Sequence, residues 1–597
     1  MPTTIEVNKQ SVEALLGSGK SKPFVIPEYQ RPYAWTDEQV ETLFEDLWDF
    51  TATSGGTERE SSYFLGSVVS YENEDGEQEI IDGQQRITSL FLLLRAIYTK
   101  LVATPASERT AEANNFIGKI EPTIWRTNKL TGTVDFKNIL LTSRVVNNEG
   151  NEILRSILET GKADEDAKDN YSKNYRHFQE LFDKHSTENP LMVYQFIYAL
   201  LNQAILLPIT ADTQDTALTI FSTLNDRGLP LSDADIFKAK IYNQLAPDDK
   251  KAFIDRWKDL DEQSTDANES IQQLFYYNMF YYRALDKDTK TTTPGVRKYY
   301  AANKFERLYK PELLDTLFVI LNLWKVVNKG EELEDEAWSK NIKIRQTLDI
   351  LTSYPNEYWK YPVVIYYVCY RNEENFETRF ARFLNKLLME LMTKYLMIPT
   401  INAVKPDILK LNSAIVVSDI PTFEFKTVDM TQLEPYIQNP NRNVVRMLLK
   451  TLAYEHQDDL LPAKWEIEHI FPQKWQTNYF PDEPDATIKE KIEHIGNKLP
   501  FEKKLNIVAG NGYFGKKKKE YIASKIVITK AMGTSDVMDW NLESITKRDI
   551  RVSDEVVKIM NRWNNEYLNT PVSEGKAGEP SEEELAQIEK FKKNGWI

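Results

Sequence analysis

The sequence has one cysteine, five histidines and no long apolar run among its 597 residues. The single cysteine, Cys369, excludes a disulfide framework and a zinc site with several cysteine ligands, and it fits a reducing compartment. The N-terminus MPTTIEVNKQ lacks the charged-then-apolar pattern of a secretory signal, and no stretch approaches the ~18 consecutive apolar residues of a membrane helix. We therefore expect a cytoplasmic protein that makes no membrane contact.

Basic residues are also outnumbered by acidic ones, which gives a formal net charge of -16. Such a charge repels nucleic acid at long range and argues against a general DNA coat protein. Residues 496–530 are the exception, since they hold nine lysines and two glutamates, a local excess of +7. Any DNA contact is therefore expected to be local.

The length and ordinary composition, with 41% hydrophobic residues, predict several folded domains. Residues 1–245 alternate strand-like runs (FLGSVVSY, EIIDG, ILLPIT) with helical patterns, which indicates an α/β unit. Residues 246–430 have aromatic-rich helical spacing and predict a mainly α-helical middle domain. Residues 431–597 form a third predicted domain, in which 571–585 is expected to be a mobile linker before a short last helix.

The segment WEIEHIFPQKW places Glu468 directly beside His469. Phosphodiester hydrolysis needs an activated water and positive charge on the phosphate, which a histidine base and a divalent ion can supply. Carboxylate and amide oxygens suit Mg²⁺ (or Mn²⁺), so Asn506 is a candidate second ligand, and Asn497 lies close enough in sequence to brace the histidine loop. A lone Glu-His pair is usually only a polar stretch of surface, but here further polar elements follow it in order.

The order EIEHIFPQ, then IGNKLP, then the lysine-rich helix resembles the HNH-type nuclease domain of the GmrSD family of modification-dependent (type IV) restriction enzymes. It is also similar to the HNH domain of RNA-guided CRISPR nucleases. The resemblance implies that His469 is the general base, that Asn497 supports catalysis, and that Glu468 and Asn506 bind the metal. It further implies DNA contacts from Lys516, Lys517, Lys518 and Lys519, although a lysine run alone is usually a solvated face.

A second candidate site lies at EIIDGQQRITSLFLLLRAIY, which reads as a strand, a tight Asp-Gly turn and a helix. The start of a helix presents free N–H groups and a partial positive charge, so it can bind phosphate. Upstream, IPEYQRPYAW adds an arginine fork and aromatic faces, although such aromatics more often fill a core. The candidate nucleotide-binding residues are Asp82, Gly83, Gln84, Gln85, Arg86, Gln30 and Arg31.

This segment resembles the N-terminal domain of the same family, which implies a ParB/sulfiredoxin-like fold whose DGQQR motif binds and hydrolyses a nucleoside triphosphate (GTP, ATP or other). No Walker sequence is present, so this would not be P-loop chemistry. A further similar element is FSTLNDRGLPLSDADIFKAK, read locally as a helix end, a turn and a Ser232-capped helix. Its matching positions are Phe221, Asn225, Gly228, Leu231, Asp235 and Lys238.

Together these features predict a multidomain α+β protein with a ParB/sulfiredoxin-like α/β N-terminal domain, a mainly α-helical middle and a C-terminal ββα-metal (HNH) nuclease domain. The expected function is a nucleotide-regulated, Mg²⁺-dependent endonuclease that cuts modified phage DNA in antiphage defence. Two alternatives stay open: a nuclease or nickase triggered by nucleotide or a partner without reading a modified base, and a catalytically inactive, ParB-like, nucleotide-dependent DNA-binding protein. A homodimer is left open.

Overall fold

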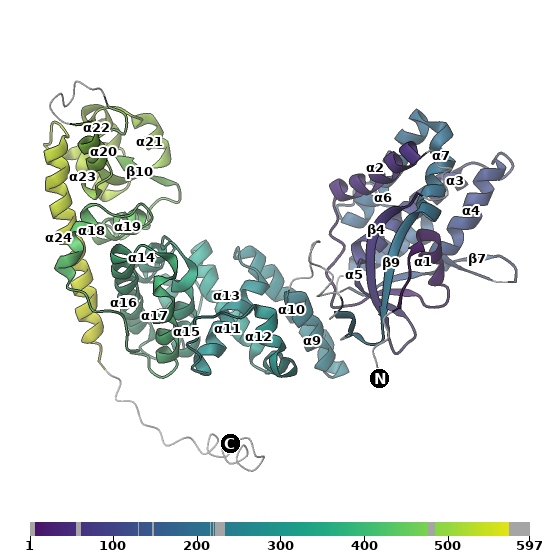
Figure 1. Ribbon diagram of the computed structural model, residues 1–597, viewed down its shortest axis with the longest axis horizontal. Coiled ribbons are helices and arrows are strands. Elements are labelled where there is room, and N and C mark those ends of the chain that lie inside the picture. The colour runs from purple at the N-terminus through teal and green to yellow at the C-terminus, as the bar shows by residue number, and fades with distance from the viewer. Residues whose placement is uncertain are drawn as a thin grey trace, which may run out of the picture. The chain divides into compact units, whose positions relative to one another are not determined.

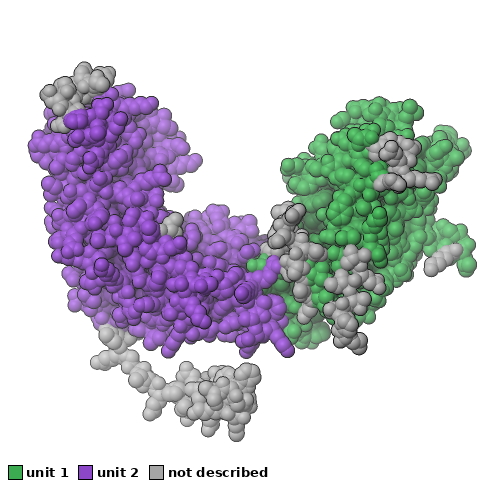
Figure 2. All heavy atoms as spheres, in the orientation of Figure 1, with its two compact units in different colours: residues 1–259 green, residues 260–597 purple. Residues whose placement is uncertain are grey.

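The computed structural model describes residues 6–54, 61–128, 130–145, 148–214, 216–218, 220, 233–475 and 484–571. The chain divides into two compact units, residues 1–259 and 260–597 (Figures 1 and 2). The division falls within helix α10 (Pro247–Asp266). The further predicted boundary at 430 stays a prediction. Apart from Pro571, the predicted linker and last helix lie outside the described residues.

In its described residues the first unit is built on a seven-stranded mixed sheet, ordered β1-β9-β4-β5-β3-β8, with β2 also paired to β9. Strand β4 runs parallel to β9 and antiparallel to β5, and β3 runs parallel to both β5 and β8. The three runs predicted as strands form β4, β5 and β9, which confirms that part of the sequence analysis. The strands are β1 (Glu6–Val7), β2 (Gln10–Ser11), β3 (Phe24–Ile26), β4 (Tyr63–Glu72), β5 (Gln78–Asp82), β8 (Leu141–Ser143) and β9 (Ala204–Ala211).

Both faces of this sheet are covered. Val68 and Ile80 pack into one hydrophobic cluster, whereas their sequence neighbours Val69 and Ile81 pack into another. Successive side chains of a strand point to opposite faces, so the continuous apolar runs of β4 and β5 reflect burial on both sides. Helix α3, buried along most of its length, contributes to the first cluster, and each large aliphatic side chain buried there contributes about 1.5–3 kcal/mol.

Helices and a short hairpin surround the sheet. The helices are α1 (Val12–Ser18), α2 (Asp37–Ser54), α3 (Gln84–Ala103), α4 (Ala111–Ile124), α5 (Asn148–Thr160), α6 (Asn170–Glu188), α7 (Val193–Tyr198) and α9 (Asp233–Gln244), and the hairpin pairs β6 (Trp125–Thr127) with β7 (Val134–Ile139).

The second unit begins with a helical block, as predicted, and its described residues contain no strand before β10. Long aromatic stretches fill its core, for example Tyr366 stacked on Phe383 with ring centroids 4.1 Å apart. Aromatic side chains bury large areas, which explains why this block needs so many of them. Its helices are α11 (Ile271–Leu285), α12 (Val296–Ala301), α13 (Leu313–Lys329), α14 (Ile342–Leu351), α15 (Lys360–Tyr370), α16 (Phe376–Met397) and α17 (Lys405–Ile415).

The end of the second unit carries the candidate active site. A long helix, α24, packs against the segment before β11 and also against α16 and α18. The elements are α18 (Glu434–Gln438), α19 (Val445–His456), β10 (Trp465–His469), α20 (Asp485–Ile492), the short helix η8 (Ile495–Asn497), β11 (Lys498–Glu502), α21 (Lys503–Ala509), α22 (Phe514–Ile522), α23 (Val527–Thr534) and α24 (Leu542–Leu568).

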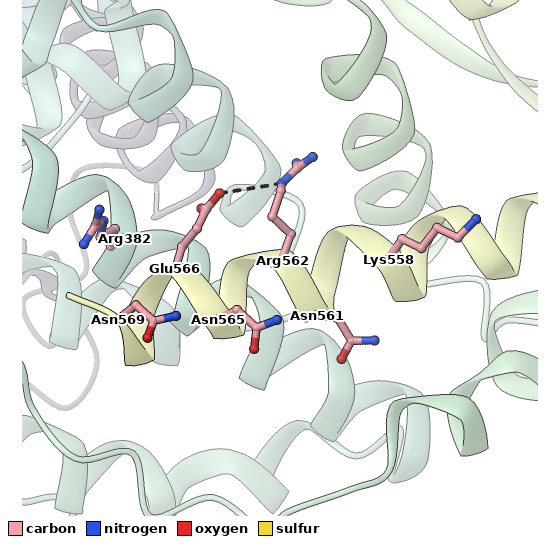
Figure 3. A pocket seen from close by; sticks show the side chains of 7 residues that line it. All are labelled: Arg382, Lys558, Asn561, Arg562, Asn565, Glu566 and Asn569. Carbon is pink, nitrogen blue, oxygen red and sulfur yellow. Dashed lines mark ion pairs between the residues drawn. The ribbon is translucent and has the colours of Figure 1, made fainter.

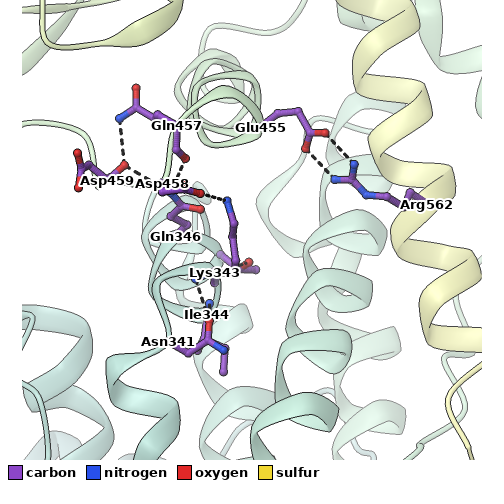
Figure 4. A network of polar contacts seen from close by, with 10 residues as sticks. Asn341, Lys343, Ile344, Gln346, Glu455, Gln457, Asp458, Asp459 and Arg562 are labelled. Carbon is purple, nitrogen blue, oxygen red and sulfur yellow. Dashed lines mark hydrogen bonds and ion pairs between the residues drawn. The ribbon is translucent and has the colours of Figure 1, made fainter.

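Polar contacts fix the connection from α19 to β10 (Figure 4). Arg562 of α24 donates two hydrogen bonds of 2.7 Å to Glu455 of α19. Gln346 of α14 donates to the main-chain oxygen of Gln457 at 2.9 Å. Exposed pairs contribute about 0–1 kcal/mol each, so they orient these helices more than they stabilise them. These contacts therefore hold the segment that leads into β10.

The outward side of α24 is polar, and with Arg382 of α16 it borders a groove (Figure 3). Three asparagines spaced by four residues line this groove: Asn561 and Asn565 lie on α24, and Asn569 directly follows its last residue. Asparagine is a poor helix former, so this helix depends on its buried side, where Ile545 and Val556 are fully buried. Within the described residues, no helix has the length and apolar character to cross a membrane.

Candidate active site

The site is built on a two-stranded antiparallel ribbon followed by a helix. Strand β10 pairs with β11 so that His469 lies opposite Lys498 and Glu468 opposite Leu499. Helix α20 lies in the connection between the strands, and α21 begins directly after β11. Adjacent residues of a strand point to opposite faces, so His469 and Glu468 diverge although they are neighbours in sequence.

His469 lies on the face that carries Glu493 and Lys498. Its imidazole is 16% exposed, and its Nε2 atom is 3.6 Å from Oε1 of Glu493. Burial lowers the pKa of His469 below its usual value, and the charge of Lys498 adds to this while that of Glu493 opposes it. The imidazole is therefore held neutral at neutral pH. Its contacts with Glu493 and Gln473 both involve Nε2, and Nδ1 has no hydrogen-bond partner among the described residues.

Glu493 connects this histidine to a buried lysine. Its Oε2 atom accepts a hydrogen bond of 2.9 Å from Nζ of Lys498, which also donates to the main-chain oxygen of Glu493 at 2.7 Å. Partial burial raises the pKa of Glu493, but Lys498 and then His469 outweigh it, so this carboxyl has a pKa below its usual value. A carboxylate is thus held beside the imidazole.

Glu468 lies on the other face, where its side chain is enclosed by α22. Only 4% of the residue is exposed, and its Oε1 atom is 2.7 Å from Nζ of Lys517 and accepts a 2.6 Å hydrogen bond from Tyr521. Burial lowers the pKa of Lys517, although the charge of Glu468 opposes this. Burial also raises the pKa of Tyr521 well above its usual value. The ion pair of Glu468 with Lys517 therefore links β10 to α22.

Asn497 holds the loop that follows His469. It is fully buried, and its Oδ1 atom accepts hydrogen bonds from the main-chain N–H of Phe471 at 2.7 Å and from the indole of Trp540 at 3.3 Å. Its amide donates to the main-chain oxygens of Phe471 and Ile492 at 3.0 and 3.1 Å. Every Asn497 side-chain contact in the described part is therefore internal. The bracing contact is present, and its catalytic role stays a prediction.

Helix α24 braces the same loop from outside, which the sequence analysis did not foresee. Asp549 accepts from the N–H of Gly496 and from Nδ1 of His494, both at 2.7 Å. The buried guanidinium of Arg548 donates to the main-chain oxygens of Gly496 and Lys498. Burial lowers the pKa of Arg548 to about 10. No local motif identifies these partners, because they lie some 50 residues along the chain from the loop.

The predicted DNA-contacting lysines do not share one surface. Lys516 and Lys519 are exposed on α22, but Lys517 is buried against Glu468. Lys518 is half-buried and donates to the main-chain oxygens of Ser535 and Val537. The expectation of a four-lysine surface therefore does not hold for Lys517, because its helical position turns it into the core. Lys516 and Lys519 remain candidates for phosphate contact.

Metal binding by Glu468 and Asn506 stays a prediction. Asn506 lies half-buried on α21, and its side chain has no hydrogen-bond partner among the described residues. The described residues contain no group of three or more His, Cys, Asp or Glu side chains arranged to hold a metal ion. The Asn506 amide oxygen and a carboxylate oxygen of Glu468 are both suitable ligands for Mg²⁺, and Lys517 contacts only Oε1 of Glu468.

In the first unit, Asp82 ends β5 and Gly83 begins the turn into α3. Gly83 has φ of +90°, and a Cβ there would lie 3.1 Å from Cγ2 of Val68, so both backbone conformation and space require glycine. Burial raises the pKa of Asp82 above its usual value, while Gly83, Arg86 and Arg31 oppose this. Burial lowers the pKa of Arg86, whose guanidinium donates to the main-chain oxygen of Ser67 at 3.0 Å.

The glutamines of this site bind protein main chain. Gln85 accepts from the N–H of Ala34 at 2.7 Å, Gln84 donates to the oxygen of Arg31 at 3.3 Å, and Gln30 donates to the oxygen of Ile81 at 2.9 Å. These contacts tie the QRPYAW segment to the start of α3. The exposed Arg31 and half-buried Arg86 are the charged groups left beside the helix start.

The third predicted element is only partly described. Phe221, Asn225, Gly228, Leu231 and Ser232 lie outside the described residues. Asp235 and Lys238 lie on α9, where both are half-buried.

Comparison with family models identifies the class of protein: both ends of the chain match restriction endonuclease domains. The model for the N-terminal domain of the GmrSD restriction endonuclease matches residues 12–242, and the model for the C-terminal domain of GmrSD restriction endonucleases matches residues 429–552. The chain therefore belongs to the GmrSD restriction endonuclease family, as its motifs predicted, and this makes it a DNA-binding restriction endonuclease of type IV. Among curated proteins, no match was found.

Proposed function

We propose that the protein is a nucleotide-regulated, Mg²⁺-dependent endonuclease that cuts modified phage DNA in antiphage defence. The proposal includes a ββα-metal (HNH) fold for the C-terminal domain and a ParB/sulfiredoxin-like fold for the N-terminal one. The observation that carries the nuclease half is His469, a largely buried imidazole with a lowered pKa at the end of β10, where Asn497 fixes the loop that follows. The order strand, strand, helix supports it.

In the proposed reaction, neutral His469 takes a proton from the attacking water. A neutral imidazole is the form that can accept this proton. The imidazole becomes positively charged, and the carboxylate of Glu493 stabilises that charge. Exposed Lys516 and Lys519 position the phosphate backbone.

A divalent cation, when bound, would neutralise charge on the reacting phosphate. Asn506 is the ligand that needs no rearrangement. In Glu468 both Lys517 and Tyr521 contact Oε1, so Oε2 is the carboxylate oxygen that would meet a cation. Chelation is expected to abolish cleavage, and added Mg²⁺ or Mn²⁺ to restore it.

For the N-terminal domain we propose nucleoside triphosphate binding and hydrolysis at the start of α3. Free N–H groups of the first helical turn and the guanidinium groups of Arg31 and Arg86 support an anion there. The glutamines would act indirectly, by holding the QRPYAW segment against the helix. Arg86→Ala protein that releases phosphate from GTP and ATP as fast as the wild type would argue against this site.

One observation favours a second candidate function. Because Lys517 neutralises Glu468, the C-terminal domain is also compatible with a catalytically inactive, nucleotide-dependent DNA-binding protein. That candidate binds DNA but gives no Mg²⁺-dependent products.

A cleavage panel separates the candidates. Wild-type and His469→Ala proteins are incubated with DNA carrying hypermodified cytosines, phosphorothioated DNA, plain DNA and RNA, each with and without nucleotide and Mg²⁺. We expect only modified DNA to be cut, with a loss of about 10²–10⁴-fold in the variant. Equal cutting by His469→Ala protein would disprove the assigned base. Cutting of plain DNA or RNA would instead favour a nuclease that reads no modified base.

A further inference from the structure

An apolar pocket of about 490 Å³ lies beside the loop that follows His469. This volume falls within the roughly 300–1,000 Å³ that small-molecule sites occupy. The pocket belongs wholly to the second unit, and nothing in the proposed mechanism uses it. It is lined by Ile470, Phe471, Pro472, Tyr513, Phe514, Met538, Asp539 and Trp540.

The walls and the rim of this pocket differ in exposure. Phe471, Phe514 and Trp540 are buried members of the domain core. Tyr513 and Met538 on the rim are 59% and 86% exposed. The mouth of the pocket is therefore lined by two large side chains that present apolar surface to solvent. A rigid aromatic floor with an exposed apolar rim suits a flat ring that enters from solvent.

The polar groups around the pocket match a nucleotide. Asp539 is exposed and accepts a hydrogen bond of 2.8 Å from the N–H of Trp540, so its carboxylate is fixed at the pocket wall. A carboxylate there can accept from the exocyclic amino group of cytosine. Exposed lysines lie on the two segments that border the pocket, Lys474 just after Pro472 and Lys516 just after Tyr513. These cations suit the phosphates on either side of a base.

We propose that this pocket receives one nucleobase, unstacked from the DNA strand next to the bond that the His469 loop cuts. The inference rests on the proposed nuclease function and adds a substrate contact to it. Tyr513 and Met538 supply the exposed contact surface at the rim, and Phe471, Phe514 and Trp540 form the buried apolar walls. Asp539 reads the amino edge. A single base is the occupant that the polar groups favour, because Asp539 matches its amino edge and the flanking lysines match the phosphates beside it.

Base binding would also act on the catalytic loop. The Oδ1 atom of Asn497 binds both Phe471 and Trp540, which are pocket walls, and Phe471 is two residues from His469. A base packed between these walls therefore holds the His469 loop in its braced position. This predicts that loss of the rim raises KM more than it lowers kcat, because the loop keeps its internal hydrogen bonds.

The test uses full-length protein with His469→Ala to prevent cutting, and a short duplex that the wild-type protein cuts. At each position near the cut, the base pair is replaced in turn by a mismatch and by an abasic site, and affinity is measured. At one position a mismatch should tighten binding, because unpairing costs less, while the abasic duplex lacks the stacked base and should bind about ten-fold more weakly than the mismatched one.

Tyr513→Ala and Met538→Ala should each remove most of the difference in affinity between the mismatched and the abasic duplex, because both side chains line the rim. Ile550→Ala is the matched control, since Ile550 is an exposed apolar side chain of the same domain outside the pocket. A flat response along a duplex that the wild type does cut would overturn the pocket proposal alone. Failure of the wild type to cut any DNA would instead overturn the function on which it rests. Rim variants that alter self-association but not DNA affinity would assign the pocket to protein contact and also overturn it.

Discussion

The ion pair between Glu468 and Lys517 offers a quantitative test of the candidate site. Both side chains are almost fully buried, and the two charged atoms are 2.7 Å apart. Removing one partner of a buried pair leaves an uncompensated charge and costs about 3–5 kcal/mol. Glu468→Gln and Lys517→Met should therefore each lower the free energy of unfolding by about this amount. The double variant should lose much less than the sum, because it leaves no unpaired charge.

The assay is chemical denaturation of the full-length variants, followed through the transition of the C-terminal domain. Lys547→Met is the matched control, because Lys547 and Glu543 form an ion pair of the same length, 2.7 Å, on the exposed side of α24. That variant should unfold like the wild type, since exposed pairs gain little from their attraction.

Added Mg²⁺ extends the same experiment to the metal. In Lys517→Met protein the free carboxylate of Glu468 can take a cation, so Mg²⁺ should restore stability in proportion to its binding. Glu468→Gln protein should show no such rescue. If both single variants unfold at the same denaturant concentration as the wild type, the buried ion pair does not stabilise the domain as argued. Equal Mg²⁺ effects on the two variants would refute Glu468 as the cation ligand.

Two further predictions concern the loop and its histidine. Burial lowers the pKa of His469 and Glu493 raises it, so Glu493→Gln should lower it further. Because the neutral imidazole is the active form, the acid limb of the pH–rate profile should move to lower pH, and an unchanged or upward-moved limb would contradict the role of Glu493. Gly496→Ala should destabilise the C-terminal domain by at least about 2 kcal/mol, because a Cβ there would lie 2.8 Å from the main-chain nitrogen of Asp549. Gly118→Ala, on the open side of α4 with nothing within 4 Å, should keep or gain stability, and thermal denaturation of the full-length variants measures both effects.

Local patterns in the sequence predicted much of the fold. The apolar runs of β4, β5 and β9, the Asp-Gly turn at Gly83 and the aromatic helices of the second unit are all encoded within about ten residues. Their periodicity reflects which face is buried, and this is visible without a structure. The pairing order of the strands cannot be predicted in this way, because it depends on contacts between segments far apart in the chain.

Contacts between distant segments limit the prediction of the candidate site even more than that of the fold. Glu468 and His469 are adjacent in the sequence, but a strand sends neighbouring side chains to opposite faces. The extended geometry of WEIEH would have been enough to separate them. Their actual partners could not be inferred, since Lys517 and Glu493 come from helices that only the folded domain brings near.

Buried amide side chains have the same structural role in the two motifs. In the N-terminal motif Gln84 and Gln85 bind main-chain groups of a neighbouring segment, and in the C-terminal one Asn497 does so. A buried amide can satisfy main-chain donors and acceptors at once without bringing a charge into the interior. Gln84, Gln85 and Asn497 are therefore expected to set loop geometry in the two motifs, so substituting any of these amides should alter stability together with activity.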